Sequence, residues 1–188
     1  MKKSILTLTA VALATAATPA VAGTLSAEVR FADVRNGNKP DSTEYKVEYW
    51  APLNSGLNYG AELQVKQRNG AGALDSKVSV KAGPNLPEVL GLHVAAYGEL
   101  GRSFKVGNNS EFWGAGVKVG RQLYGPVSVT AGYRHRQGFE AADLLNEERL
   151  HGGLALDIGS GNAVGATYYR TRGTTNADAI GVNLTHKF

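Results

Sequence analysis

The chain has 188 residues, with 20 Lys and Arg against 16 Asp and Glu, 24 Gly and no Cys. This length suits a single domain, and the absence of cysteine excludes a disulfide-stabilised scaffold. The small excess of basic residues gives no reason to expect a nucleic-acid partner.

Residues 1–22 have the features of a secretory signal peptide. Two lysines at the start precede an apolar run, residues 5–17, and an A-x-A cleavage signature follows at residues 20–22. The apolar run is shorter than the roughly 20 residues of a membrane-spanning helix. We therefore expect cleavage after residue 22, so that residues 23–188 form one domain with 18 basic and 16 acidic residues.

Period-two alternation of apolar and polar residues recurs along the rest of the chain, which is the pattern of β-strands with one apolar face. It is clearest at the end, where Ile180, Val182 and Leu184 alternate with Gly181 and Asn183. The pattern predicts strands at residues 25–31, 44–49, 57–66, 75–82, 90–100, 113–119, 127–136, 149–158, 164–169 and 180–188.

Nearly every predicted strand carries charges on one face and almost none on the other. Hydrocarbon offers no hydrogen-bond partner, so extended chain can cross a membrane only as a closed sheet. A charge on the lipid face is unfavourable, so the charged face must line the lumen. We predict an all-β, transmembrane, antiparallel up-and-down β-barrel of about ten strands, with eight or twelve as alternatives.

A soluble sandwich or lipocalin-like barrel has the same period but places its aliphatic side chains inside. Aromatic residues near the strand ends favour the membrane alternative, because they form interfacial girdles in outer-membrane barrels. The predicted girdle residues are Tyr45, Tyr49, Tyr59, Trp113, Tyr133, Tyr168 and Phe188. Tyr97 and Tyr169 belong to the inner face instead.

The connections between strands alternate between short and longer, as in outer-membrane barrels. Tight, Gly-, Pro- and Asn-rich turns are predicted at residues 52–56, 83–87, 123–126 and 159–162. Outer loops are predicted at residues 35–41, 68–73, 102–109, 137–147 and 172–178, with one helical turn within residues 141–145.

Many glycines fall on the predicted inner face, where they either leave room for a long neighbouring side chain or allow the sheet to curve. They are Gly60, Gly91, Gly114, Gly116, Gly132, Gly153, Gly165 and Gly181.

The inner face also holds the charged side chains that we predict to line the lumen. The bases are Arg30, Lys46, Lys66, Lys77, Lys81, Lys118, Arg134, Arg136 and Arg149. The acids are Glu28, Glu44, Glu48, Glu62, Asp75, Glu99 and Asp157. One interpretation is a salt-bridged plug in a non-conducting structural or adhesive barrel, with outer loops that bind partners. The other is a narrow channel for small anions, with a basic wall of Lys77, Lys81, Lys118, Arg134, Arg136 and Arg149.

The segments 29–31, 45–48, 56–57 with Glu62, and 132–136 resemble the small oligogalacturonate- and sialic-acid-specific porins of enteric bacteria. That family consists of narrow monomeric barrels of twelve strands, whose arginine tracks pass acidic oligosaccharides. The resemblance implies a porin-like channel for passive diffusion of small anionic solutes through a charged lumen.

We expect no enzymatic activity, no metal and no cofactor. The sequence has no G-x-S-x-G elbow and no metal-ligand spacing. Of the four histidines, His135 and His186 fall on the lipid side, whereas His93 and His151 face inward and could approach Glu99 or Asp157.

The signal peptide and the C-terminal Phe188 together indicate the bacterial outer membrane. A terminal aromatic residue resembles the recognition signal of the outer-membrane assembly machinery. The expected partners are therefore this machinery, outer-membrane lipid and lipopolysaccharide, and small anionic solutes.

Overall fold

The computed structural model describes residues 22–33, 42–53, 56–68, 74–84, 86–105, 108–140, 145–174 and 176–188. The predicted signal peptide lies outside these residues except for Ala22, and so does the predicted helical turn except for Leu145. The predicted outer loop at residues 35–41 also lies outside them.

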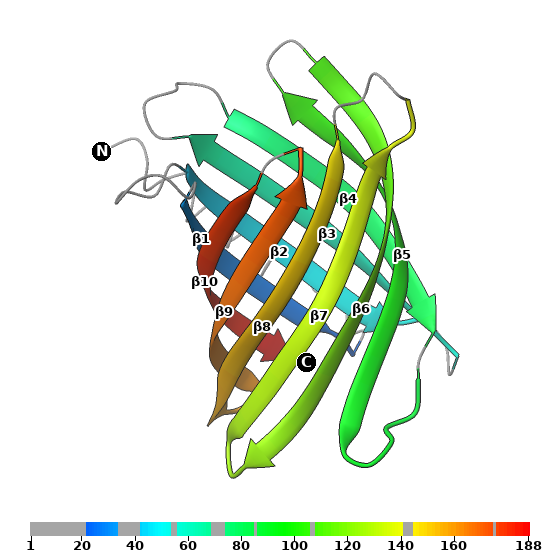
Figure 1. Ribbon diagram of the computed structural model, residues 1–188. Helices are drawn as coiled ribbons and strands as arrows, with labels where there is room; N and C mark the ends of the chain where they lie inside the picture. The colour runs from blue at the N-terminus through cyan, green and yellow to red at the C-terminus, as the bar shows by residue number, and fades with distance from the viewer. Residues whose placement is uncertain are drawn as a thin grey trace.

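The described residues form ten antiparallel strands, which confirms the predicted number (Figure 1). The strands are β1 (Thr24–Asp33), β2 (Ser42–Pro52), β3 (Leu57–Arg68), β4 (Leu74–Pro84), β5 (Leu92–Lys105), β6 (Asn108–Tyr124), β7 (Val127–Gly138), β8 (Asn146–Gly159), β9 (Asn162–Gly173) and β10 (Ala177–Lys187). No helix among the described residues has the length and apolarity needed to span a bilayer.

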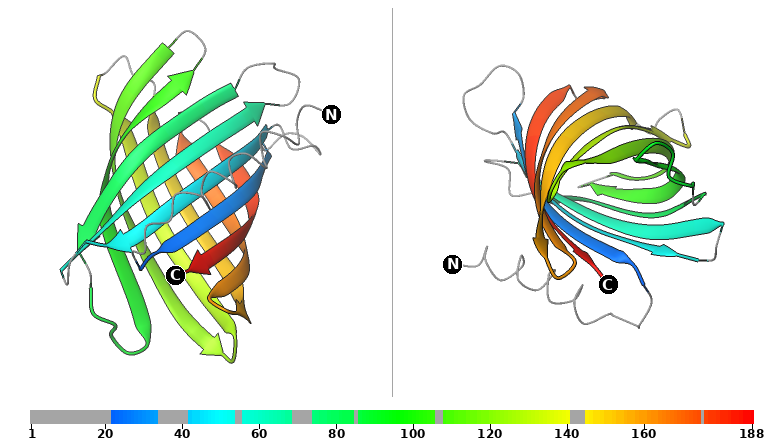
Figure 2. Two further views of the ribbon diagram at one scale, coloured as in Figure 1. Left: turned by 180° about the vertical axis from the view of Figure 1, so that it is seen from behind. Right: turned by 90° about the horizontal axis from the view of Figure 1, so that it is seen from below.

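Each strand pairs with its neighbours in the sequence, and β1 closes the barrel by pairing with β10. The closing register runs from Thr24 opposite Lys187 to Asp33 opposite Asp178. The strands tilt strongly relative to the barrel axis, and the view from below shows them curving around a common centre (Figure 2). Because β1 pairs with β10, no strand of the sheet has a free edge, as a lipid environment requires.

We call the end of the barrel that holds Thr24 and Lys187 the turn end, and the opposite end the loop end. Short connections close the turn end after β6 and β8, where Gly125 and Gly161 have positive φ. The connection between β4 and β5 is longer than the predicted turn. Leu90 lies in that connection with φ 54°, so β5 begins at Leu92.

At the loop end, the strands extend further than the sequence indicated. The predicted loop at residues 102–109 is mostly strand, because β5 continues to Lys105 and β6 begins at Asn108. Similarly, Asn146 and Glu147 belong to β8 rather than to the predicted loop.

The barrel has its polar side chains inside and its apolar side chains outside, the reverse of a water-soluble protein. Its buried polar and charged residues include Glu28, Arg30, Glu62, Gln64, Ser79, Lys81, Glu99, Arg134, Arg136 and Arg149. Large apolar side chains lie exposed on the outside, among them Val80, Leu100, Leu154, Ile180, Val182 and Leu184. An exposed aliphatic surface around a polar interior is stable in hydrocarbon and unfavourable in water. The soluble alternative is therefore excluded.

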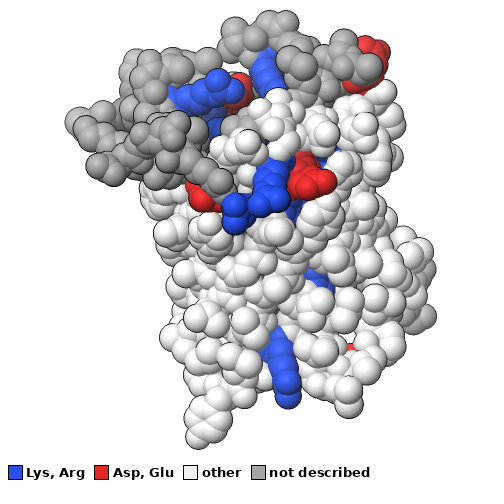
Figure 3. All heavy atoms as spheres, viewed as in Figure 1, with Lys and Arg blue, Asp and Glu red and all other residues white. Residues whose placement is uncertain are grey.

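The visible face has a broad region with few charges, and most of its charges gather near one end (Figure 3). At the loop end, outward-facing charges of opposite sign lie opposite each other in the register, such as Arg102 with Glu111 and Glu148 with Arg172. Below them, the exposed aliphatic residues form a band around the outside of the barrel, which we call the aliphatic belt.

The predicted girdle residues lie at two levels of this belt. Tyr49 and Tyr59 pack edge to face near the turn end, where Phe188 packs against His186. Trp113 packs against His135 in the loop-end half, and Tyr133 of β7 and Tyr168 of β9 are exposed. Two aromatic levels on either side of an aliphatic band are typical of transmembrane barrels.

Inward-facing glycines make room for large side chains. A Cβ at Gly60 would lie 2.8 Å from the Trp50 ring, and one at Gly116 would lie 2.4 Å from the Tyr97 ring. Gly91 differs from the prediction: it lies in the β4–β5 connection with φ +74°, not on the inner face of a strand. The other predicted glycines lie in strands, so room for neighbouring side chains is one reason for the glycine content.

Substitution of two glycines in β5 tests this interpretation. A Cβ at Gly101 would lie 2.6 Å from the Val78 carbonyl oxygen and 2.4 Å from Phe112 Cζ. We expect Gly101→Ala to destabilise the barrel by about 1–3 kcal/mol through overpacking, measured by urea unfolding in lipid vesicles. Gly98 has no heavy atom within 4 Å of its Cβ position. Gly98→Ala should therefore change stability by less than about 0.5 kcal/mol, and equal effects of the two changes would contradict the interpretation.

Candidate functional site

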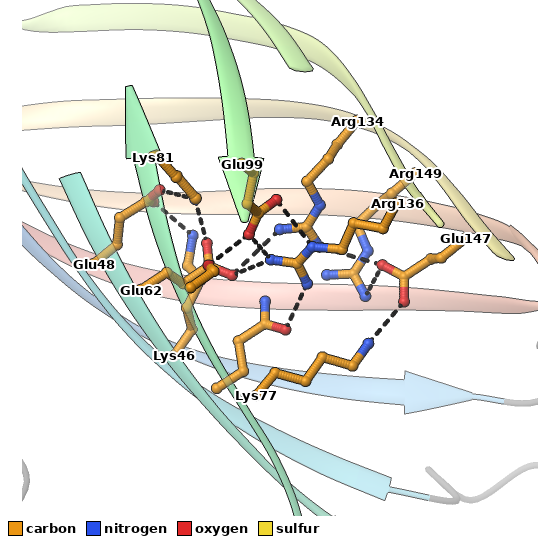
Figure 4. Close-up of polar contacts among 12 residues, drawn as sticks. Lys46, Glu48, Glu62, Lys77, Lys81, Glu99, Arg134, Arg136, Glu147 and Arg149 are labelled. Atoms are coloured by element: carbon orange, nitrogen blue, oxygen red, sulfur yellow. Dashed lines mark hydrogen bonds and ion pairs between the residues drawn. The ribbon is translucent and has the colours of Figure 1, made fainter. Parts of the chain in front are cut away.

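A closed ring of alternating acidic and basic side chains crosses the lumen, and we call it the ion-pair ring. Figure 4 shows the part of the ring from Lys46 through Glu62 and Arg134 to Arg149, together with neighbouring charged side chains. In order around the ring, its members are Glu28, Arg30, Glu44, Arg149, Glu147, Arg134, Glu62, Lys81, Glu48 and Lys46. They come from six strands on opposite sides of the barrel, β1, β2, β3, β4, β7 and β8.

On one side of the ring, Arg30 bridges β1 and β2. Its Nη2 lies 2.8 Å from Glu28 Oε2, and its Nη1 lies 2.5 Å from Glu44 Oε1. Lys46 Nζ then joins Glu28 to Glu48, with 3.2 Å to a carboxylate oxygen of each. Local period-two spacing produces the Arg30–Glu28 and Lys46–Glu48 contacts, because residues two apart on one strand share the inner face. The other two contacts join the paired strands β1 and β2.

The opposite side of the ring is joined across the lumen by two contacts between distant strands, Arg134 of β7 with Glu62 of β3 and Arg149 of β8 with Glu44 of β2. Glu62 Oε2 lies 2.6 Å from Lys81 Nζ, and Glu62 Oε1 lies 3.3 Å from Arg134 Nη1. Arg134 Nη2 also contacts Glu147 Oε1 at 3.2 Å. Arg149 completes this side, at 3.2 Å from Glu147 and 3.6 Å from Glu44.

Arg136 fills the space beside the ring and is fully buried. It donates to Glu99 from Nε at 3.0 Å and from Nη2, and Nη2 also donates to Glu62 at 2.7 Å. Its Nη1 donates to Gln64 Oε1 at 3.0 Å. The guanidinium also lies 5.0 Å from the centre of the Phe112 ring. Charged groups buried in a confined space need such pairing, because an unpaired charge there is costly.

Two cavities lie on either side of the ion-pair ring. The loop-end cavity has a volume of about 110 Å³, and the turn-end cavity has a volume of about 610 Å³. The charged residues of the loop-end cavity are Arg30, Lys66, Arg68, Lys77, Lys105 and Arg149 against Glu44, Asp75 and Glu147. Those of the turn-end cavity are Arg30, Lys46, Lys81, Lys118, Arg134, Arg149 and Lys187 against Glu28, Glu48 and Glu62. Both cavities therefore have an excess of basic residues.

Most of the charged residues predicted to face the lumen do so. Asp157 is the exception: it is exposed at the end of β8, and its Oδ1 accepts a hydrogen bond from the Gly159 amide at 2.8 Å. The alternation is correct for this residue, but the strand leaves the lumen before reaching it. Asp75 contacts Arg68 at 3.3 Å near the loop end.

The predicted basic wall is not a free basic surface. Five of its six residues contact carboxylates: Lys77, Lys81, Arg134, Arg136 and Arg149. Among the described residues, Lys118 has no ion pair or hydrogen bond, and Lys66 likewise has none. These two lysines face the turn-end and the loop-end cavity, respectively.

Sequence reasoning missed Glu147, which contacts Lys77, Arg134 and Arg149. It was assigned to an outer loop, although it continues the inward alternation of Arg149 and His151. The indole of Trp50 was also missed, and it donates to Glu48 Oε1 at 3.0 Å. Extending the period-two pattern by one residue pair would have found Glu147.

The histidines do not form a catalytic arrangement with the predicted carboxylates. His151 packs against the Tyr169 ring at 5.7 Å rather than approaching Glu99 or Asp157. His93 is exposed and lies 3.2 Å from Glu88. Within the described part of the chain, no three His, Cys, Asp or Glu residues gather as a metal site would require.

The closed antiparallel barrel with its lipid-facing exterior has the fold of an outer-membrane β-barrel. No protein-family model matches the sequence. A search of curated proteins likewise found no significant match.

Solved structures with this fold are similar to the chain. A KdgM porin in complex with disordered oligogalacturonate has a TM-score of 0.51 and 10% identity over 88% of this chain and 99% of its own. LpxR from Salmonella typhimurium has a TM-score of 0.54 and 11% identity over 88% of this chain and 100% of its own. The beta domain of the Bordetella autotransporter BrkA has a TM-score of 0.53 and 13% identity, covering 90% of this chain and 100% of its own. At these identities, the likeness concerns the fold.

Proposed function

We propose that this protein is a small outer-membrane channel for passive diffusion of small anions, in which the ion-pair ring forms the constriction. The observation that carries the proposal is the basic excess on both sides of the ring. Basic side chains along a narrow pore lower the barrier for anions and raise it for cations. One KdgM porin of the same fold was solved with oligogalacturonate, an acidic oligosaccharide, which supports the proposal. The proposal assigns the protein no catalytic activity and no cofactor.

Planar-bilayer recording tests this function. We expect discrete current steps and a reversal potential that favours chloride over potassium in a salt gradient. Lys66→Gln and Lys118→Gln remove cavity charges that have no ion pair among the described residues, so each should weaken anion preference without unfolding the barrel. Arg172→Gln, an equal charge change on the outward-facing side, should leave the selectivity unchanged.

The second candidate is a non-conducting structural or adhesive barrel. It is favoured by the burial of the ring, since Glu62 is 3% and Lys81 4% exposed, and by the burial of Arg136 beside it, which is 0% exposed. Electrical silence of well-folded wild-type protein would support this candidate and overturn the channel.

We also propose that outer-membrane lipid and lipopolysaccharide surround the aliphatic belt, and that the assembly machinery recognises the C-terminal strand.

Phe188 is 48% exposed and lies next to the pairing of β1 with β10 that closes the barrel, and its amide donates to the Gly23 carbonyl at 2.9 Å. We expect deletion of Phe188 to reduce the assembled protein several-fold, with accumulation and degradation in the periplasm. Cell fractionation measures this, and Phe188→Tyr, which keeps an aromatic end, should assemble normally. Equal assembly of the deletion variant would contradict the role of Phe188.

A further inference from the structure

Lys118 and His151 stand on either side of a glycine in the wall of the turn-end cavity. In the register, Gly132 of β7 lies opposite Lys118 of β6 and opposite His151 of β8. A Cβ at Gly132 would lie 2.5 Å from His151 Cε1 and 2.7 Å from Nε2. The imidazole therefore covers the glycine and leans toward the strand that carries Lys118.

Neither side chain has a polar partner among the described residues, and both line the cavity. The inward positions next to Lys118 are occupied by small residues, with Gly116 and Gly120 on its own strand and Ala95 opposite. Consequently, no neighbouring side chain at these positions can neutralise its ammonium group.

The acids that line the same cavity are already paired. Glu28 forms ion pairs with Arg30 and Lys46, and Glu48 forms ion pairs with Lys46 and Lys81. Glu62 contacts Lys81, Arg134 and Arg136. Each of these carboxylates is therefore shared by at least two other cations, and among the described residues none of the three forms an ion pair with Lys118.

The shape of the cavity adds to this argument. It extends from the ion-pair ring to the barrel mouth at the turn end, where Thr24, Lys187 and Phe188 lie. Its volume of about 610 Å³ falls within the range of about 300–1,000 Å³ that is common for small-molecule sites. The Thr130 hydroxyl, two residues from Gly132 on the inner face of β7, supplies a further polar group to the wall.

We propose that the turn-end cavity is a binding site for a small oxyanion, a carboxylate or a phosphate, held by the Lys118 ammonium and an imidazole N–H of His151. The ligand enters from the turn end. The site goes beyond the proposed channel function, because it requires no passage through the ion-pair ring.

Trp50 provides a reporter inside this cavity. The chain has two tryptophans, and the other, Trp113, lies on the outer surface. In a Trp113→Phe background, we expect iodide to quench Trp50 at least about twofold more efficiently, relative to neutral acrylamide, than it does after Lys118→Gln. Inorganic phosphate and succinate should each protect Trp50 from iodide, and His151→Gln should weaken this protection.

Two variants serve as controls. Lys66→Gln makes the same change on the other side of the ion-pair ring and should leave iodide quenching of Trp50 unchanged. Lys118→Arg keeps the charge and should retain the protection, which separates loss of the site from misfolding. Iodide quenching that is insensitive to Lys118→Gln, or protection by neither phosphate nor succinate, overturns the inference. If planar-bilayer recording shows no current but phosphate or succinate still protects Trp50 from iodide, the binding site is supported and only the channel function is contradicted.

Discussion

Arg136→Ala should destabilise the barrel by about 3–5 kcal/mol, because removing one partner of a buried ion pair leaves the others uncompensated. Arg136 is fully buried and donates to both Glu62 and Glu99. Without it, Glu99 keeps only the hydroxyl of Ser79, which donates at 2.5 Å, as its hydrogen-bond partner among the described residues. Urea titration of the protein in lipid vesicles, followed by tryptophan fluorescence, measures the change.

The Arg68–Asp75 pair offers a matched control. Its contact of 3.3 Å lies near the loop end, and the Arg68 side chain is 63% exposed. Exposed pairs of this kind contribute about 0–1 kcal/mol, so Arg68→Ala should have little effect. In addition, the double variant Arg136→Ala/Glu99→Ala should lose less stability than the sum of its single changes. A mild effect of Arg136→Ala would mean that the lumen is hydrated rather than packed.

Val182→Arg should hinder insertion into lipid vesicles by about 2–4 kcal/mol, the cost of placing an arginine on the lipid face near the bilayer midplane. Val182 lies in the middle of β10, is 52% exposed, and pairs with Val29 and Ala166. The folded fraction can be measured over a urea series from the shift in electrophoretic mobility of unheated samples.

Leu123→Arg is the control, because Leu123 is similarly exposed at 57% but lies near the turn end of β6. There an arginine reaches the interface, and the expected effect falls to about 0–1 kcal/mol. In a water-soluble fold both substitutions would be tolerated alike. Equal behaviour of the two variants would therefore remove the membrane interpretation, and the channel with it.

The strand positions could be predicted because their signal is local. Alternation such as Ile180, Gly181, Val182 and Asn183 reflects the two faces of one strand, and it needs no knowledge of neighbouring strands. Closure of the sheet also follows from the sequence, since backbone groups in lipid must be paired within the barrel.

The errors lie where this local signal weakens. At the loop end, the strands leave the hydrocarbon and both faces become polar. Arg102 was therefore assigned to a loop and Glu111 was left outside the predicted strand, although the two residues pair across β5 and β6. At the turn end, Asp157 keeps the inward alternation but has already passed the mouth of the lumen, where it stabilises a turn. Alternation predicts which face of the sheet a side chain lies on, but it does not predict the position of that side chain along the barrel axis.

The sequence by itself determined that charged side chains face inward and aliphatic ones outward, because that choice depends on solvent alone. Only the tertiary structure decided how the inward charges combine. Arg136 and Glu62 are separated by 74 residues, and their contact depends on the curvature and register of the closed sheet. The same curvature pairs five residues of the apparent basic wall with carboxylates and leaves Lys118 and His151 in the wall of the turn-end cavity.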